Sequence, residues 1–398
     1  MREITQCEVC GNNDLSLVLN LGSHPLPDDL RAIGDPTHPT EYPVQVLFCN
    51  VCKTAHQRYQ VPKTLLFPPT YHYRARQTQD VIDGMHQFVD SCKRKMLIDG
   101  ARVLDIGCND GTLLNAFRAH GALTTGIEPT DAAYDAQRAG HGVAHEFFDL
   151  QSATDYTHAY PKPDLITFTN VFAHIENLDD LLTALIIVKK PSTWIVIENH
   201  YLGSVLDRNQ FDTFYHEHPR TYSYTSFLKI AEHLGMHVAS VEFPVRYGGN
   251  IRVFLKPGDG PSPQPVIEDD FGSRLVELND KVKLWSANKL MEIEQATMGG
   301  PISAAAFPGR AAILIRLLGL DRIDLEAVYE KPGSKKIGYY ATGTYIPIVS
   351  DEVFQCLGEM DRPVLNMAWH IPAEIEKRWR GFGYTGRFIQ AVDPGDFS

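Results

Sequence analysis

The sequence predicts an α/β protein with a doubly wound parallel sheet at its centre. Strand and helix patterns alternate between residues 103 and 199, and the first predicted strand, VLDIG, runs into a glycine-containing turn before a helix. The chain of 398 residues is also too long for one ordinary hydrophobic core, which indicates more than one domain.

Three domains are expected. Residues 1–75 are short strand-like pieces broken by Gly, Pro and Asn, which is typical of a small, turn-rich, metal-stabilised domain. Residues 76–260 carry the alternating pattern of the central sheet. Residues 261–398 are predicted to form a long charged connector helix over 265–298 and then a second, Rossmann-like α/β domain.

Composition excludes several classes of protein. A formal net charge of −12 gives no support for binding a nucleic-acid backbone, and no apolar run of membrane-spanning length is present. The N-terminal segment has no apolar core like that of a signal peptide, so we expect a cytoplasmic protein without membrane partners. Its seven cysteines are therefore expected to be free thiols or metal ligands.

Four of the cysteines form two CxxC pairs, CEVC and CNVC. Each pair supplies two thiolates at one turn, and together they match a closed, structural zinc site. The alternatives are two coincidental pairs or a redox dithiol. The predicted zinc ligands are Cys7, Cys10, Cys49 and Cys52.

The turn after the first predicted strand reads DIGCNDG and suits close approach of the backbone to a ligand. The next strand ends with Glu128, which can accept hydrogen bonds from ribose hydroxyls. The turn lacks the GxGxxG spacing of a dinucleotide site, and Asp110 adds negative charge, which favours S-adenosylmethionine over NAD. The alternative is a purely structural turn. Predicted cofactor-binding residues are Asp105, Gly107, Cys108, Asn109, Gly111, Glu128, Pro129 and Asn170.

A dense polar cluster, YHEH, follows the last predicted strand of the central sheet. A histidine beside a carboxylate and a phenol can act as an oriented general base, and His218 is the main candidate. His174, after the third strand pattern, is a second candidate or a structural residue. The run RYGGNIRVFL suits either backbone approach to a ligand or a strand bulge.

The order of these motifs, followed by a C-terminal α/β segment, resembles the three-domain sugar C-methyltransferases that act on nucleotide-linked keto-sugars, such as the tetronitrose C-3 methyltransferase. The resemblance covers nearly the whole chain. It implies a class I S-adenosylmethionine-dependent methyltransferase sheet between the zinc domain and the C-terminal domain, with the substrate in the cleft among the three.

The resemblance also implies roles for individual residues. The family's Tyr-x-Glu-His motif falls on Tyr215, Glu217 and His218, and its linker tyrosine falls on Tyr73 or Tyr71, which stays open. Arg310 stands where the family has a lysine. The implied catalytic residues are His218, Glu217, Tyr215, His174 and Tyr73. Arg74 and Arg76 replace a serine-rich stretch of the family, and their guanidiniums could grip a phosphate or a carboxylate. The predicted substrate-binding residues are Tyr71, Arg74, Arg76, Asn250, Arg252, Arg310 and Lys336.

The expected reaction is C-methylation in deoxysugar biosynthesis: His218, oriented by Glu217, removes a proton next to the ketone of a nucleotide-linked sugar, and the enolate is methylated. Two alternatives stay open, an O-methyltransferase for a sugar or sugar nucleotide and a non-catalytic sugar-nucleotide-binding protein. The sequence is compatible with a monomer or weak homo-oligomer.

Overall fold

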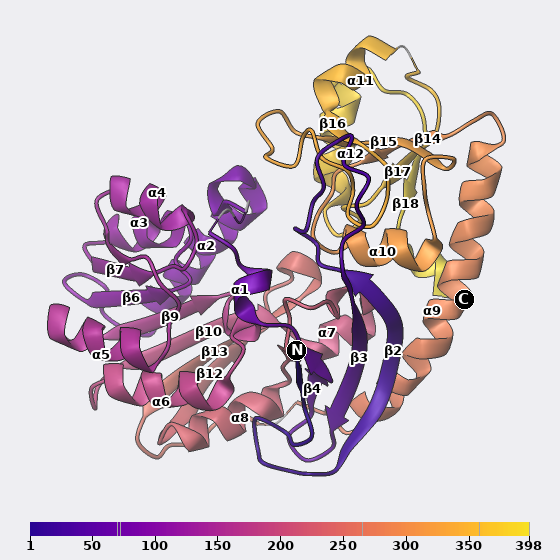
Figure 1. Cartoon of the computed structure of the whole chain (residues 1–398). Coiled ribbons are helices and arrows are strands. Elements are labelled where there is room, and N and C mark those ends of the chain that lie inside the picture. The colour runs from indigo at the N-terminus through magenta and orange to yellow at the C-terminus, as the bar shows by residue number, and fades with distance from the viewer. Residues whose placement is uncertain (70, 72, 265, 358, 398) are drawn as a thin grey trace.

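The computed structural model describes residues 1–69, 71, 73–264, 266–357 and 359–397, and Figure 1 shows its three bodies. A seven-stranded sheet with its helices lies on one side, a C-terminal α/β body lies on the other, and the long N-terminal strands pass between them. The observed fold confirms the predicted α/β class with a smaller domain at each end of the chain.

The central sheet has the strand order β12-β13-β10-β9-β6-β7-β8. Five neighbouring strands are parallel, and β13 runs antiparallel to both of its neighbours, β10 and the edge strand β12, so the sheet is mixed at this edge. The strands are β6 (Arg102–Ile106), β7 (Leu123–Ile127), β8 (Gly142–Ala144), β9 (Leu165–Thr169), β10 (Trp194–His200), β12 (Met236–Glu242) and β13 (Asn250–Pro257).

Helices cover both faces of this sheet because successive side chains of each strand point to opposite faces. Val103 packs in one apolar cluster with α2 and α3, whereas Leu104 packs in another with α5 and α6. Both faces are therefore buried, as a doubly wound sheet requires. The helices are α2 (Gln79–Lys93), α3 (Thr112–Arg118), α4 (Ala132–Arg138), α5 (Leu150–Ala159), α6 (Leu178–Val188), α7 (Leu202–Asp207) and α8 (Tyr224–His233).

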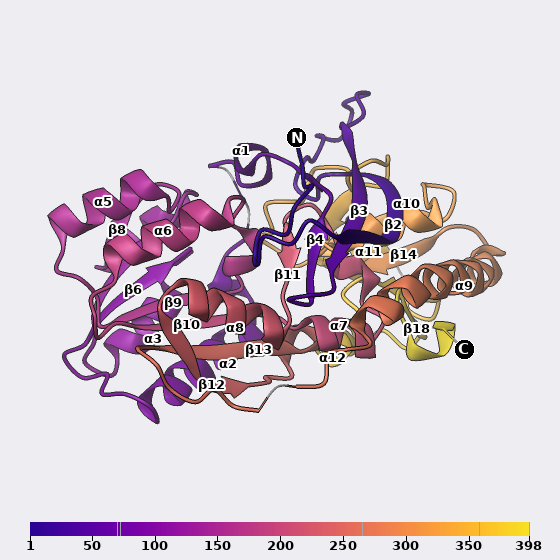
Figure 2. The ribbon, with the colours of Figure 1, turned by 90° about the horizontal axis from the view of Figure 1, so that it is seen from below.

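The N-terminal body is an antiparallel sheet of order β11-β4-β3-β2. One of its strands, β11, comes from the middle of the chain and lies beside β4 (Figure 2). Its strands are β2 (Leu15–Pro25), β3 (Glu41–Cys49), β4 (Thr54–Gln57) and β11 (Arg220–Thr221), and beside it are the pair β1 (Arg2–Glu3) and β5 (Tyr59–Gln60) and the helix α1 (Lys63–Leu66).

The C-terminal body is a five-stranded parallel sheet of order β16-β15-β14-β17-β18, in which the strand order reverses at β14. This is the Rossmann-like arrangement that the sequence predicts. Its elements are β14 (Ile302–Ala305), α10 (Ala311–Leu318), β15 (Leu325–Glu330), β16 (Ile348–Ser350), α11 (Asp351–Leu357), β17 (Val364–Asn366), α12 (Pro372–Gly381) and β18 (Phe388–Gln390).

The connector helix is α9 (Phe271–Thr297), which begins later than the predicted 265–298; residue 265 lies outside the described residues. This helix contacts the segments at both ends of the chain. Trp285 Nε1 donates to the Ala391 carbonyl at 2.9 Å, and Asn279 Nδ2 donates to the Val18 carbonyl at 2.6 Å. The helix therefore ties the N-terminal sheet to the C-terminal body (Figure 1).

The domain boundaries 1–75, 76–260 and 261–398 remain predictions, and β11 shows that the N-terminal body also draws on a later segment. None of the described helices is long and apolar enough to cross a membrane. Short 3₁₀ turns complete the list of elements: Ala75–Gln77, Phe172–His174, Phe211–Thr213, Arg246–Gly248 and Pro394–Phe397.

Candidate active site

A cavity of about 940 Å³ lies where the three bodies meet. That volume is near the upper end of the range for ligand pockets, about 300–1,000 Å³. Its lining runs from the turn after β6, past the histidines of the central body, to the C-terminal body. The cavity therefore has room for a cofactor at one end and an acceptor at the other.

The turn after β6 forms the cofactor end. Gly107 has a φ of +70° and Asn109 a φ of +49°, a left-handed conformation that glycine and asparagine tolerate best. A Cβ on Gly107 would lie 2.6 Å from Cγ2 of Val171, so the turn also has no space for a side chain. Backbone groups thus line the cavity closely here, which fits the approach of a cofactor.

Two buried carboxylates support this turn. Glu128 accepts hydrogen bonds from the Asn109 amide at 3.0 Å and the Thr130 amide at 2.9 Å, and Asp105 accepts one from Thr167 Oγ1 at 2.7 Å. Burial raises the pKa of Asp105 to about 7, with a further rise from the charge of Glu128, although the Thr167 hydrogen bond opposes it. Both carboxyl groups line the cavity, where they can accept hydrogen bonds from a bound cofactor.

The other predicted cofactor residues divide into two groups. Cys108, Pro129 and Asn170 line the cavity. Gly111 is not among the described lining residues; it precedes α3 with a φ of +79°. The buried Asp110 carboxylate accepts hydrogen bonds from the Arg76 amide and from Thr112 and is not among the described lining residues.

Four aromatic side chains meet at the acceptor end. The His218 ring centroid lies 4.4 Å from that of Tyr215, 4.8 Å from that of His174 and 5.3 Å from that of His200. All four residues line the cavity. Burial lowers the pKa of His218 well below its usual value, with a further decrease from neighbouring His174, so the ring is neutral at physiological pH.

The tautomer of His218 follows from its partner. Nδ1 lies 2.8 Å from the carbonyl oxygen of Thr213, which can only accept, so Nδ1 carries the proton and Nε2 keeps a lone pair. The expected orienting group, Glu217, does not hold this ring. The reason is that adjacent side chains of the loop point in different directions. Glu217 faces Tyr71, while the Thr213 carbonyl orients His218.

His174 has a different environment. Its Nδ1 lies 2.6 Å from the Glu217 carbonyl, and the Asn170 carbonyl is a second backbone partner. Burial lowers its pKa to about 4 against these two hydrogen bonds. His174 therefore joins two loops of the site through its ring.

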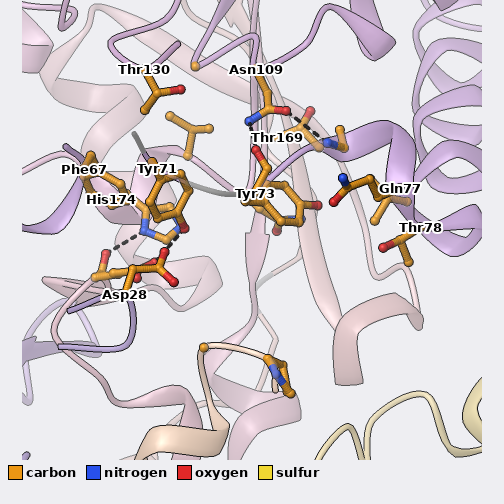
Figure 3. A pocket seen from close by; sticks show the side chains of 18 of the residues that line it. Asp28, Phe67, Tyr71, Tyr73, Gln77, Thr78, Asn109, Thr130, Thr169 and His174 are labelled. Carbon is orange, nitrogen blue, oxygen red and sulfur yellow. Dashed lines mark hydrogen bonds between the residues drawn. The ribbon is translucent and has the colours of Figure 1, made fainter. Parts of the chain in front are cut away.

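An acidic cluster lies beside the histidines. Tyr71 donates to Glu217 at 3.1 Å, and Lys336 Nζ lies 3.5 Å from Asp28. Figure 3 shows Asp28, Tyr71 and His174 together at one end of the cavity. Of the two linker tyrosines, Tyr71 thus contacts the Glu217 carboxyl group, whereas Tyr73 lines the cavity nearer to Asn109, which donates to its carbonyl at 3.2 Å.

Several residues predicted to bind substrate are engaged elsewhere and are not among the described residues that line the cavity. Arg74 pairs with Asp135 at 3.1 Å, and Arg76 pairs with the same carboxylate at 3.2 Å. Both guanidiniums hold the linker against α4 instead of facing a ligand.

Asn250 and Arg252 are likewise structural. Both are buried on β13, where they bind Glu198 of the neighbouring strand at 3.0 and 2.7 Å. A buried charge requires such a partner. Asn250 and Arg252 therefore support the sheet, and neither is among the described residues that line the cavity. Lys336 and Arg310, by contrast, do line the cavity.

Arg310 lies at the start of α10 and contacts the central body. Its Nη1 donates to Gln210 at 3.1 Å and lies 3.8 Å from Asp212, while its buried Nη2 has no hydrogen-bond partner among the described residues. A buried cationic donor without a protein partner is well suited to bind an anionic ligand.

Sequence reasoning missed several cavity residues. Asp28 and His200 stand singly in the sequence, with no motif around them, and Glu330 ends a strand of the C-terminal body. Of these three, only Glu330 had a detectable signal, since it is the last residue of the second strand of its sheet, and Glu128 lies directly after the second strand of the central sheet. Glu330 accepts the Phe307 amide at 2.6 Å, which repeats the Glu128 to Asn109 contact in the C-terminal body.

The four cysteines of the N-terminal body meet in space. Their Sγ atoms lie within 4.8 Å of one another, with 3.4 Å between Cys7 and Cys52 and 3.6 Å between Cys10 and Cys49. Sulfurs about 2.3 Å from a tetrahedral zinc lie about 3.8 Å apart, so the cluster fits zinc and is too open for disulfides. Cys10 is partly exposed and the other three are buried.

Comparisons with known proteins agree with this architecture. A family model described as "Putative zinc binding domain" matches residues 7–67, one described as "Methyltransferase domain" matches 72–241, and one described as "C-methyltransferase C-terminal domain" matches 274–393. Together the models span the three bodies in order.

The C-methyltransferase NovU of Streptomyces niveus is 27% identical over 410 residues, which cover 98% of this chain and 96% of that protein. A ubiquinone biosynthesis O-methyltransferase of Thiobacillus denitrificans is 31% identical over 28% of this chain and 46% of its own length. The solved magnesium protoporphyrin IX methyltransferase of Synechocystis, with bound SAM, has 14% identity and a TM-score of 0.33, and covers 45% of this chain and 79% of that chain. The chain is an S-adenosylmethionine-dependent methyltransferase with a zinc-binding domain before its methyltransferase domain and a C-methyltransferase C-terminal domain after it.

Proposed function

We propose that the protein methylates a carbon next to the ketone of a nucleotide-linked sugar, with His218 as the base. The observation that carries the proposal is the neutral His218 ring, whose Nδ1 is held by the Thr213 carbonyl and whose Nε2 keeps its lone pair. A neutral imidazole can remove a proton only from an activated carbon, so a ketone is required in the acceptor.

The residues around His218 suit the charge that then develops. Removal of the proton leaves an enolate oxygen, and Tyr215 offers a phenolic donor at the same end of the cavity, while the Tyr71 hydroxyl donates to Glu217. Burial raises the pKa of both phenols well above the usual value, so both keep their protons. S-adenosylmethionine supplies the methyl group when bound at the turn after β6.

The nucleotide part of the acceptor is proposed to bind the C-terminal body. Glu330 repeats at β15 the position that Glu128 has at β7, and a carboxylate at such a strand end can bind ribose hydroxyls. Arg310 and Lys336 are among the cations of the C-terminal body that line the cavity, together with Lys331, Lys335 and Arg378, and their charge suits the diphosphate.

The test is hydrogen exchange in D2O with thymidine-diphosphate-linked keto-deoxyglucose, followed by NMR. We expect the α proton to exchange with the wild-type protein and S-adenosylhomocysteine, and not with His218→Ala. Retained exchange in His218→Ala would remove His218 from the role of base.

The second candidate is O-methylation, which the partial similarity to a ubiquinone biosynthesis O-methyltransferase favours. The same neutral His218 would then deprotonate a hydroxyl group. NMR of the product separates the two reactions, since a C-methyl and an O-methyl group have different carbon shifts. A protein that binds the sugar nucleotide without releasing S-adenosylhomocysteine would instead be a binding protein.

A further inference from the structure

The segment that follows His218 belongs structurally to the N-terminal body. β11 pairs antiparallel with β4, and the Gln57 amide donates to the Pro219 carbonyl at 2.8 Å. Figure 2 shows β11 beside β4, away from the strands of the central sheet. The backbone next to the proposed base is therefore positioned by the zinc domain.

The side chain of Arg220, the first residue of β11, extends this connection. It is fully buried, and its guanidinium donates to the Glu8 carboxylate, to the Tyr222 hydroxyl at 2.8 Å, and to the carbonyls of Ile175 and Glu176, the latter at 3.2 Å. One planar group thus holds both the segment after His218 and the loop after His174.

Glu8 belongs to the turn that carries two of the four clustered cysteines. It lies in the turn between Cys7 and Cys10, and it also accepts hydrogen bonds from Arg2 and from Gln60 Nε2, the latter at 2.9 Å. Because two zinc ligands flank it in the chain, its place depends on the folded, metal-bound turn.

The two loops that Arg220 holds are those that carry the histidines. His174 Nδ1 lies 2.6 Å from the Glu217 carbonyl, and the His174 and His218 rings are 4.8 Å apart. If the loop at 175–176 moved relative to β11, this contact would change. A displacement of about 1 Å in catalytic geometry can reduce turnover about 100-fold.

We propose that Arg220 is a positioning residue that, through Glu8, couples the zinc-bound turn to the geometry of His174 and His218. The zinc site then supports catalysis from a distance, without touching substrate or cofactor. This inference rests on the proposed function, which gives His218 the role of base, and it adds Arg220 as the residue that positions His218.

The test compares Arg220→Lys, which keeps the charge but loses the planar fork, with Glu8→Gln, which keeps the shape but loses the charge. The matched control is Arg58→Lys, since Arg58 pairs with Glu3 at 2.9 Å in the same body, and its other side-chain hydrogen bond goes to Gln45 and not to either loop. Zinc content, calorimetric affinity for S-adenosylmethionine, and kcat and KM with thymidine-diphosphate-linked keto-deoxyglucose are measured for each.

We expect both test variants to keep zinc and cofactor affinity, to keep KM within about threefold, and to lose about 10- to 100-fold in kcat, with shifted imidazole N–H signals in NMR. The control should match the wild type. If Arg220→Lys does not fold, the test depends on Glu8→Gln, because Glu8 is partly exposed and its substitution should disturb the fold less than that of the fully buried Arg220. A zinc-bound Glu8→Gln protein with wild-type kcat and imidazole signals overturns the proposal.

His218→Ala measured in parallel separates this proposal from the proposed function. An inactive His218→Ala beside a fully active Glu8→Gln rejects the positioning role alone. A fully active His218→Ala rejects the base, and the positioning proposal falls with it.

Discussion

The two ends of the cavity are built in different ways. At the cofactor end, the turn after β6 and Glu128 come from neighbouring strands of one sheet, and backbone groups do much of the lining. At the acceptor end, Asp28, His218 and Lys336 come from three separate parts of the chain. The cofactor end can thus form within the central body, whereas the acceptor end requires all three bodies to be docked.

We expect the largest effect, and the clearest test of this difference between the two ends, from removal of the metal. A structural zinc site contributes about 10–16 kcal/mol to the folding of its domain, so Cys49→Ser should unfold the N-terminal sheet. We expect methyl transfer to be lost while binding of S-adenosylmethionine, measured by calorimetry, survives in the central body. Zinc content by metal analysis is the control. Loss of cofactor binding in parallel would show that the two ends are not independent.

Gly107→Ala tests the cofactor end. The left-handed conformation costs alanine about 1–2 kcal/mol, and its Cβ would overlap Val171, so we expect cofactor affinity to fall by more than about tenfold. Gly100→Ala is a matched control, because Gly100 has nearly the same φ, +72°, and no neighbour within 4 Å. Equal affinities in the two variants would contradict the steric explanation.

Two arginines test which cations bind the acceptor. Arg310→Gln removes a buried charged donor, worth about 1.5–3 kcal/mol with an anion, so KM for the nucleotide sugar should rise about 10- to 100-fold. Arg76→Ala removes only a partly exposed ion pair, worth about 0–1 kcal/mol, and should leave KM nearly unchanged. Steady-state kinetics measures both. A larger rise in KM for Arg76→Ala than for Arg310→Gln would indicate that the linker arginines bind the substrate after all.

The smallest expected effect is in the pH dependence of stability. Burial, with the charge of Asp28, raises the pKa of Glu217 to about 8, against the Tyr71 hydrogen bond and the charge of Lys336. Because the pKa of Glu217 in the folded protein exceeds the ordinary value of 4.5, the stabilising contribution is complete below pH 4.5 and is lost as the pH rises through about 8.

Glu217→Gln cannot titrate, so its unfolding free energy should not show this loss. Over that interval the wild type should lose stability relative to the variant, by at most about 1.4 kcal/mol per pH unit, in urea unfolding at a series of pH values. Parallel curves for the two proteins would place the pKa of Glu217 at its ordinary value.

Comparison of sequence and structure shows which features could be predicted. The α/β class, the zinc cluster and the turn after β6 have local signals, since CxxC spacing and a glycine turn after a buried strand are visible over a few residues. The polar cluster after the sheet led to His218, and the resemblance to the sugar C-methyltransferases added Arg310; both side chains line the cavity. The predicted grip of Arg74 and Arg76 on a phosphate had no such basis, because a sequence does not show that Asp135 lies beside them.

By itself, the sequence determined the elements whose chemistry depends on neighbours along the chain: the paired thiols, the left-handed turn at Gly107 and the buried strands. Only the tertiary structure decided which polar groups face the cavity. Arg252 is neutralised by Glu198 inside the sheet, while Arg310 lines the cavity, with an Nη2 that has no hydrogen-bond partner among the described residues, and no local pattern distinguishes them. The physical reason is that a buried charge takes whichever partner the fold brings to it, and that partner is distant in sequence.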